Sequence, residues 1–317
     1  MGMTNTGNTK RTVPYFLIKE WADETGRVRS VTRENEEFEI LGAEEVFTEE
    51  CRGGGNPAAA DGVFSDVIGE IIREKEVDSL LTLTAAVLLT LELYGKIPPV
   101  PVRKDGGPED PEKRLKVVFP YLMDLKYAVL EVSGGNSFVL ADHPLYMDNI
   151  LFPEKKDGWF DPLYRRGVLC IVPLTPVRAL MLFDSSSYWL HGKDGRIVLT
   201  WDDVSRINRY TMERSSRALV TPEKDGYSPG RSPEYYRDYF VDYSRYGTTP
   251  FSFISVKPEA EENGKELRPC MDSLSCMDYL RPCSDSRKPA EEESVEERIG
   301  RALLMLKEKG EREDNGN

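Results

Sequence analysis

Residues 138–149, which read FVLADHPLYMDN, carry the polar side chains of this chain that are best suited to chemistry. Asp142 and His143 follow an apolar stretch directly, and Asp148 and Asn149 come six residues later. Carboxylate and amide oxygens are ligands for divalent cations, and Asp and His side chains can transfer protons. The pattern therefore permits a metal-dependent hydrolytic site in which Asp142 and Asp148 are the metal ligands.

The same pattern also fits a structural role for Asp142. Pro144 disfavours helical backbone at the residue before it, and an Asp at such a turn can accept hydrogen bonds from backbone N–H groups. The chain has only one acidic cluster of this kind and only two histidines, His143 and His191. We therefore favour the structural turn over a functional carboxylate.

Asn208 presents a second choice between structure and function. It lies four residues after Val204 on the apolar face of an expected helix, where a buried amide must find hydrogen-bond partners. The Asp142 turn or the backbone of residues 173–176 would be structural partners. Alternatively, Asn208 and Asp142 could line one polar pocket.

The sequence gives little support to nucleophilic catalysis, to a zinc site or to a phosphate-binding loop. No Gly-x-Ser-x-Gly motif is present, Cys170 lies within an apolar strand pattern, and the serines of DSSSYWLHG neighbour His191 only in sequence. The five cysteines lack the close spacing of a zinc site. The glycine-rich residues 51–62 lack the Lys-Ser/Thr pair of a phosphate-binding loop, so we interpret them as a linker.

Charge and hydropathy restrict the partners and the location. The net charge of −13 and the pI of about 4.9 disfavour nucleic acid, because a polyanion requires a basic surface. The longest apolar run, residues 79–95, contains polar residues and is shorter than the roughly 20 residues of a membrane span, so it predicts a buried helix. The sparse cysteines and the absence of an apolar N-terminal leader predict a cytoplasmic protein without a membrane span.

The elements that must position the candidate residues begin with helices. Residues 1–10 are polar and are expected to be disordered. Residues 11–50 predict a module in which a helix begins at Pro14 and a turn at Gly26 leads into a strand. Residues 63–125 predict a helical middle part with three helices.

Residues 127–222 predict one β-sheet, ending near Trp201, and a covering helix. The Gly-Gly-Asn sequence at residues 134–136 predicts a hairpin, and the continuous apolar runs that follow predict strands buried on both faces. Thr200 and Asp203 form a capping-box pattern at the start of the helix. The fold class expected is α+β with a mixed sheet and covering helices.

A tyrosine-rich segment, residues 227–256, completes a single expected domain over residues 11–256. It contains a predicted helix with Tyr235 and Tyr239 on one face and with interleaved arginines that could bind single-stranded nucleic acid by base stacking. Acidic residues on the same helix would repel phosphate, so a helix that docks on the sheet is the favoured interpretation.

Residues 257–317 are acidic, are poor in large apolar residues and predict a mostly disordered tail. Within this tail, residues 292–309 predict an amphipathic terminal helix. Such a helix either folds back on the domain or binds a partner protein.

Three stretches together resemble the bacterial domain of unknown function 4238 family: FVLADHPLYMDN, CIVPLTPVRALMLF and VSRINRYTMERSSRALV. The earlier stretches RTVPYFLIKEWADETGRVRSV and ILGAEEVFTEE resemble the opening elements of that family, so the resemblance covers most of residues 11–222. It implies an architecture but no activity.

The chain departs from the family pattern at two places. Arg11 stands where the pattern begins with His, and Ala141-Asp142-His143-Pro144 stands where it has Ser-Asp-Asn-Pro. A ligand or base supplied by the first His of the pattern would therefore be absent from this chain.

The sequence favours a binding or interaction protein whose protein partner is reached through the tyrosine-rich segment or the terminal helix. The alternative is a metal-dependent hydrolase, with a nuclease as one option, that uses a divalent metal ion at the Asp142 cluster. The candidate residues are Asp142, His143 and Asp148 for catalysis, Asp142 and Asp148 for the metal, and Asn208, Asn149, Arg11, Tyr235 and Tyr239 for binding.

Overall fold

The computed structural model describes residues 9–32, 37–50, 65–73, 79–95, 121–122, 124–151, 163, 166–192, 196–215, 218–222 and 251–258. Several predicted features lie outside these residues. They are the glycine-rich linker, the third helix of the helical middle part, the tyrosine-rich helix and the terminal helix.

The N-terminal module has the predicted helix and strand. Helix α1 (Tyr15–Lys19) begins directly after Pro14, and Gly26, whose φ of 79° suits glycine, leads into strand β2 (Arg27–Thr32). β2 pairs with β3 (Glu39–Gly42), while β1 (Thr9–Arg11) pairs with β4 (Thr48–Glu50). β1 thus begins two residues before the expected start of the folded part.

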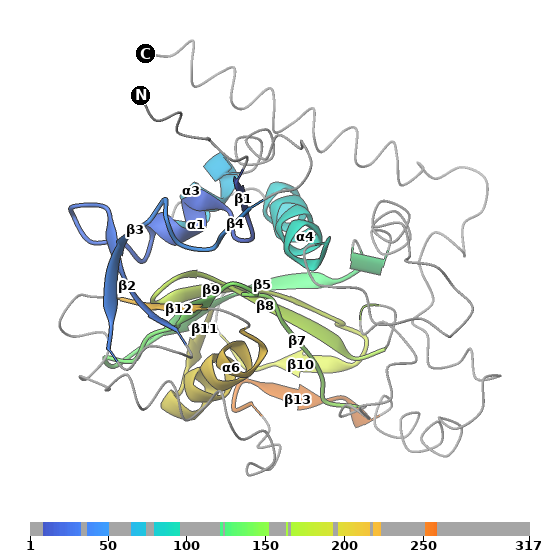
Figure 1. The fold of residues 1–317 in the computed structure, drawn as a ribbon. Coiled ribbons are helices and arrows are strands. Elements are labelled where there is room, and N and C mark those ends of the chain that lie inside the picture. The colour runs from blue at the N-terminus through green and yellow to red at the C-terminus, as the bar shows by residue number, and fades with distance from the viewer. Residues whose placement is uncertain are drawn as a thin grey trace, which may run out of the picture.

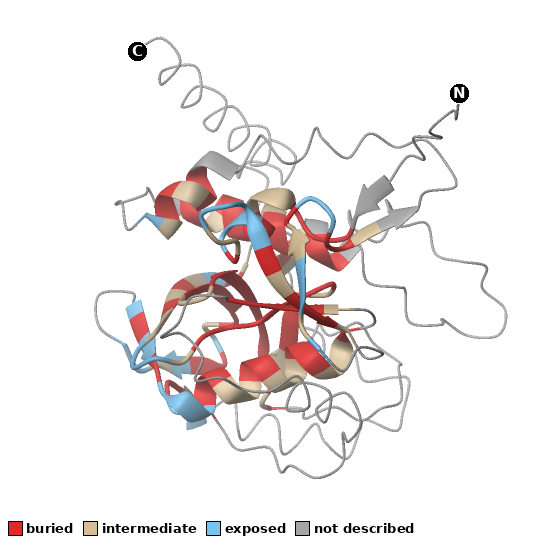
Figure 2. Cartoon of the chain, turned by 60° about the vertical axis from the view of Figure 1, so that its left-hand side comes forward, coloured by how far each residue is buried: buried red, intermediate tan, exposed pale blue. Residues whose placement is uncertain are grey.

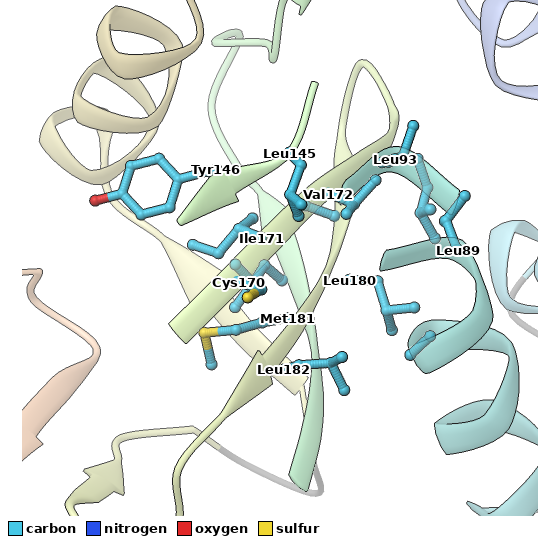
Figure 3. Close-up of a cluster of buried hydrophobic side chains, with 14 of the residues drawn as sticks. Leu89, Leu93, Leu145, Tyr146, Cys170, Ile171, Val172, Leu180, Met181 and Leu182 are labelled. Atoms are coloured by element: carbon cyan, nitrogen blue, oxygen red, sulfur yellow. The ribbon is translucent and has the colours of Figure 1, made fainter. Parts of the chain in front are cut away.

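Two helices of the middle part cover the central sheet, as Figure 1 shows. Helix α3 (Ser65–Ile72) packs on strand β8 (Val168–Thr175). Helix α4 (Ser79–Gly95) packs on strands β5 (Lys126–Val132) and β9 (Arg178–Phe183). Leu89 and Leu93 of α4 lie on the same side of the sheet as Leu180 of β9 (Figure 3). The prediction of a buried helix at residues 79–95 is therefore confirmed. Every helix in the described part of the chain is too short or too polar to cross a membrane.

The central sheet has five strands in the order β11-β5-β9-β8-β7, with bounds β11 (Arg196–Leu199), β5 (Lys126–Val132), β9 (Arg178–Phe183), β8 (Val168–Thr175) and β7 (Tyr146–Asn149). β11 and β5 are parallel and the other pairs are antiparallel, so the sheet is mixed as predicted. Every residue of β8 and β9 is buried, which confirms strands covered on both faces (Figure 2). Pro173 lies at a shift in the β8–β9 register, where its missing N–H can be accommodated.

The Arg178 side chain connects the end of helix α3 to the central sheet. Its guanidinium donates hydrogen bonds to the carbonyl oxygens of Ile71 and Ile72 at the end of α3. Its Nε lies 3.3 Å from a carboxylate oxygen of Glu131 on β5. The buried positive charge is thus paired with a carboxylate and also satisfies carbonyl groups at a helix C-terminus.

The prediction of one sheet over residues 127–201 is wrong. β6 (Leu140–Ala141) belongs to a four-stranded sheet ordered β3-β2-β12-β6, with β12 at Ala218–Thr221. β10 (Tyr188–Leu190) forms a separate ribbon with β13 (Ile254–Val256). The strands of the expected single sheet are therefore distributed over three sheets.

The predicted hairpin around residues 134–136 is also wrong. Gly134 and Gly135 do have positive φ angles, of 77° and 79°, as a tight turn requires. After this turn, however, the chain follows another course, because the Phe138 N–H donates to the Pro176 oxygen and β6 pairs with β12. A turn sequence specifies the local reversal but not the partner of the next strand.

Helix α6 (Trp201–Arg214) packs against β6 and β7. It lies on the side of the central sheet opposite α4, in the same layer as β10 and β13 (Figure 1). The predicted capping box is present, with the Thr200 side chain accepting from the Asp203 N–H and the Asp203 carboxylate accepting from Thr200. The inner face of α6 contains the buried residues Val204, Ile207, Thr211 and Met212.

Candidate functional site

Asp142 lies where the chain crosses from one large sheet to the other. It follows β6 of the four-stranded sheet, and β7 of the central sheet begins four residues later. Its side chain is 2% exposed, and one carboxylate oxygen accepts a 2.7 Å hydrogen bond from the Ser215 hydroxyl. Ser215 is the C-cap residue of α6. The carboxylate therefore fixes the strand crossing to the end of a helix.

His143 is a titratable neighbour of this carboxylate. Its Nε2 lies 3.8 Å from Oδ2 of Asp142, and its side chain is partly exposed. The distance is longer than a hydrogen bond and permits an ion pair when the imidazole is protonated. The Ser215 hydroxyl contacts Asp142 and not the imidazole, which is not the arrangement of a serine nucleophile with a histidine base.

Asp148 is held in a different network, over the middle of α6. Oδ2 of Asp148 accepts hydrogen bonds from Arg206 at 2.8 Å and from the Tyr146 hydroxyl at 2.6 Å, and Oδ1 accepts from the Asn149 N–H at 2.7 Å. Burial and the Asp148 carboxylate raise the pKa of Tyr146 well above its usual value. Tyr146 therefore keeps its proton and is a permanent donor to Asp148.

Aromatic rings lie next to Arg206 and Tyr146, the two side chains that donate to Asp148. The Arg206 guanidinium lies 4.2 Å from the centre of the Phe251 ring, and the rings of Tyr146 and Tyr210 are 4.2 Å apart. The Tyr146 ring points from β7 toward α6 (Figure 3). Cation–π and ring contacts of this kind are stabilising where water is excluded.

The two acids proposed as metal ligands contact different parts of one helix. Ser215, the partner of Asp142, and Arg206, the partner of Asp148, are nine residues apart in sequence. At the rise of an α-helix, the backbones of these two partners are about 13.5 Å apart. In the described part of the chain, no group of three or more His, Cys, Asp or Glu side chains could hold a metal ion.

Asn208 binds backbone upstream of the Asp142 turn. Its Nδ2 donates to the Ser137 carbonyl oxygen at 2.7 Å, and its Oδ1 accepts from the Val139 N–H at 3.0 Å. One side-chain amide therefore satisfies a donor and an acceptor of the segment that leads into β6. This segment replaces the two structural partners expected from the sequence, the Asp142 turn and the backbone of residues 173–176.

Of the other binding candidates, the structure describes the side chain of Asn149. Asn149 donates from Nδ2 to the Arg166 carbonyl oxygen at 2.6 Å and so holds the turn before β8. Arg11 lies in β1, opposite Thr48, and its side chain is outside the described residues, as are Tyr235 and Tyr239.

Sequence reasoning missed two carboxylate contacts. Asp203, expected only as a capping residue, also accepts hydrogen bonds from the N–H and hydroxyl of Ser252, at 2.8 Å and 2.5 Å. Asp184 accepts four hydrogen bonds at the turn after β9. The serines two and three residues after Asp184 are a readable signal for such a turn, whereas nothing in the sequence connects Asp203 with Ser252.

His191, the other histidine, has a partner that is distant in sequence. Its Nε2 lies 2.9 Å from the Ser255 hydroxyl across the β10–β13 ribbon, and the pair is exposed. The neighbouring serines of DSSSYWLHG instead surround Asp184. Proximity in sequence therefore did not indicate the hydroxyl group that contacts this imidazole.

These elements define an α+β protein in which one amphipathic helix, α6, holds the strands of two sheets through polar side chains. Residues 103–225 match the family model described as "Protein of unknown function (DUF4238)", which supports the resemblance over this part of the chain. The match includes the Asp142 turn and α6, while the resembling stretches before residue 51 precede it. No curated protein and no solved structure was found to match the chain.

Proposed function

We propose that this chain is a binding or interaction protein and that the Asp142 turn is structural. One observation carries the proposal. Within the described residues, the polar groups best placed for chemistry are hydrogen-bonded to other parts of the fold: Asp142 to Ser215, Asp148 to Arg206 and Asn208 to the segment before β6. These side chains already have partners within the fold, so binding of a substrate or a metal ion would compete with contacts that stabilise it.

The partner surfaces we propose are those indicated by the sequence, the tyrosine-rich segment and the terminal helix. In the predicted helix at residues 292–309, Val295, Ile299, Leu303 and Leu306 form one apolar face. An amphipathic helix binds a protein by placing such a face in an apolar groove of the partner. We also propose a cytoplasmic location, which the sparse and odd-numbered cysteines support.

Affinity capture with the full chain, followed by calorimetric titration of the purified partner, tests the proposal. Leu303→Glu should weaken binding at least about tenfold, because it places a charge on the apolar face. Leu304→Glu is the matched control, since it introduces the same charge about 100° away around the helix. Equal binding by both variants would argue against the terminal helix as the site.

A Mn²⁺ titration separates this proposal from the hydrolase alternative. We expect neither the wild-type protein nor Asp142→Asn to bind Mn²⁺ stoichiometrically, with the fold of the variant checked by circular dichroism. Stoichiometric binding by the wild type that is lost in Asp142→Asn, together with Mn²⁺-dependent cleavage of a phosphodiester, would make the strand crossing a metal site and overturn the structural interpretation.

A further inference from the structure

The two large sheets have four edge strands, β3, β6, β7 and β11. An edge strand has backbone N–H and C=O groups that point away from its sheet and can pair with another strand. Folded proteins therefore cover such edges with side chains or protect them with charge. The four edges of this protein differ in this respect.

β7 and β6 are covered from α6. Beside β7, the Met147 N–H donates to the Tyr210 hydroxyl at 3.4 Å, and the Asn149 N–H donates to the Asp148 carboxylate. The approach to β6 is bound by Asn208, which accepts from the Val139 N–H. Backbone groups at both edges are therefore already satisfied by side chains.

β3 is protected by charge. The Arg27 side chain donates to the Ile40 carbonyl oxygen at 3.0 Å, and the carboxylate of Glu45 accepts from the Gly42 N–H at 2.9 Å. Exposed acids lie at the start of this strand and on both sides of it, namely Glu37, Glu39, Glu44 and Glu45. A second copy approaching this edge would meet like charge.

β11 has little of this protection among the described residues. It pairs with β5 on one side, and the Arg196 side chain lies 3.4 Å from Glu131. At the start of the strand, Gly192 approaches the backbone so closely that a Cβ there would lie 2.6 Å from the Arg196 carbonyl oxygen. The strand contains no lysine, proline or acid. Val198 is 62% exposed, the highest value among the large apolar side chains, whereas Ile197 and Leu199 are buried.

We propose that β11 is a self-association site at which two copies of this chain pair their β11 strands antiparallel across a two-fold axis. With Val198 opposite Val198 of the second copy, Ile197 of each copy lies opposite Leu199 of the other. Residues opposite each other point to the same face of a sheet, so this register places exposed side chains together and buried side chains together. The two central sheets would then form one continuous sheet.

The charges of β11 suit this register. Arg196, which is 48% exposed, lies opposite Thr200 of the second copy, and Asp202 follows in the exposed first turn of α6. The two-fold axis repeats this approach of a cation to a carboxylate, so both ends of the strand pair are favourable. Trp201, 58% exposed, adds apolar surface beside the strand. Self-association does not depend on the proposed binding of a partner protein.

Sedimentation velocity of the full chain over a concentration series tests the inference. We expect a species of twice the 36.0 kDa chain mass that grows with concentration. Val198→Lys, which places two like charges opposite each other, should raise the dimer dissociation constant at least about tenfold. Ile40→Lys, the same change on the edge strand β3, should leave it unchanged. A monomer at all concentrations, or equal effects of both variants, would overturn the inference.

A cross-link tests the register. Opposite residues on antiparallel strands have Cβ atoms about 4.5–5.5 Å apart, close enough for a disulfide after a small adjustment. Val198→Cys should therefore form an intermolecular disulfide between the two substituted positions on mild oxidation, identified by peptide mass spectrometry, whereas Ile40→Cys should not. A linkage of equal yield in both variants would contradict pairing through β11.

Discussion

Two buried aspartates, Asp142 and Asp184, follow buried strands in this protein, yet they are held in different ways. Asp184 follows β9 and accepts from the Gly167 N–H and from the N–H or hydroxyl groups of Ser186 and Ser187. Asp142 follows β6 and accepts from Ser215, which is 73 residues away in sequence. One carboxylate is therefore held mainly by its own turn, and the other by a distant helix end.

The hydrogen bonds that Asp184 accepts also affect the pKa of its carboxyl group. Burial acts to raise the pKa of the Asp184 carboxyl, but the hydrogen bonds from Gly167, Ser186 and Ser187 outweigh it and lower the pKa below its ordinary value of 3.8. A carboxylate whose ionised form is stabilised in this way contributes to the structure as an anion. Asp184 therefore has a structural role, and the sequence DSSS contains most of its hydrogen-bond donors.

Removal of the Asp184 side chain should produce the largest loss of stability. Asp184→Ala leaves the buried Gly167 N–H and the Ser187 hydroxyl without their acceptor, and we expect about 3 kcal/mol less free energy of unfolding. Urea denaturation followed by circular dichroism measures this loss. Ser185→Ala in the same turn is the control and should change the stability by less than about 0.5 kcal/mol. Equal losses would show that the turn, and not the carboxylate, is responsible.

The local elements of this fold could be predicted because their partners are near in sequence. The capping box of Thr200 and Asp203, the turn at Gly26 and the doubly buried strands β8 and β9 all follow from short-range spacing. Each depends on residues within one turn or on the periodicity of one strand.

The distribution of strands among sheets could not be predicted in the same way. β12 pairs with both β2 and β6, and Arg29 of β2 donates to the hydroxyl of Thr221, which is 192 residues later. The residue pattern of a strand does not identify a partner strand that is so distant in sequence. For the same reason, the sequence suggested a metal site from Asp142 and Asp148, although different parts of α6 bind them.

A double-mutant cycle should show a smaller but specific effect at the long-range contact. Ser215→Ala removes the donor to Asp142 and should cost about 1–2 kcal/mol of the free energy of unfolding. Asp142→Ala should cost about 2 kcal/mol, and the double variant should lose about 1 kcal/mol less than the sum, because the shared hydrogen bond is lost only once. Additive losses would show that the Ser215–Asp142 contact contributes nothing to stability.

The pH dependence of stability should distinguish Asp184 further, with an effect smaller than that of deleting the side chain, because the protonated carboxyl still fills the turn. The folded-state pKa is lowered, so the contribution of Asp184 is fully present above 3.8 and is lost as the pH falls through the folded-state pKa. Asp184→Asn removes this proton linkage while keeping the shape. The stability difference between the wild type and Asp184→Asn, measured by urea denaturation from about pH 5 to about pH 2, should therefore shrink as the pH falls. A difference that stays constant over this range would show that the carboxylate charge is not what its hydrogen-bond donors stabilise.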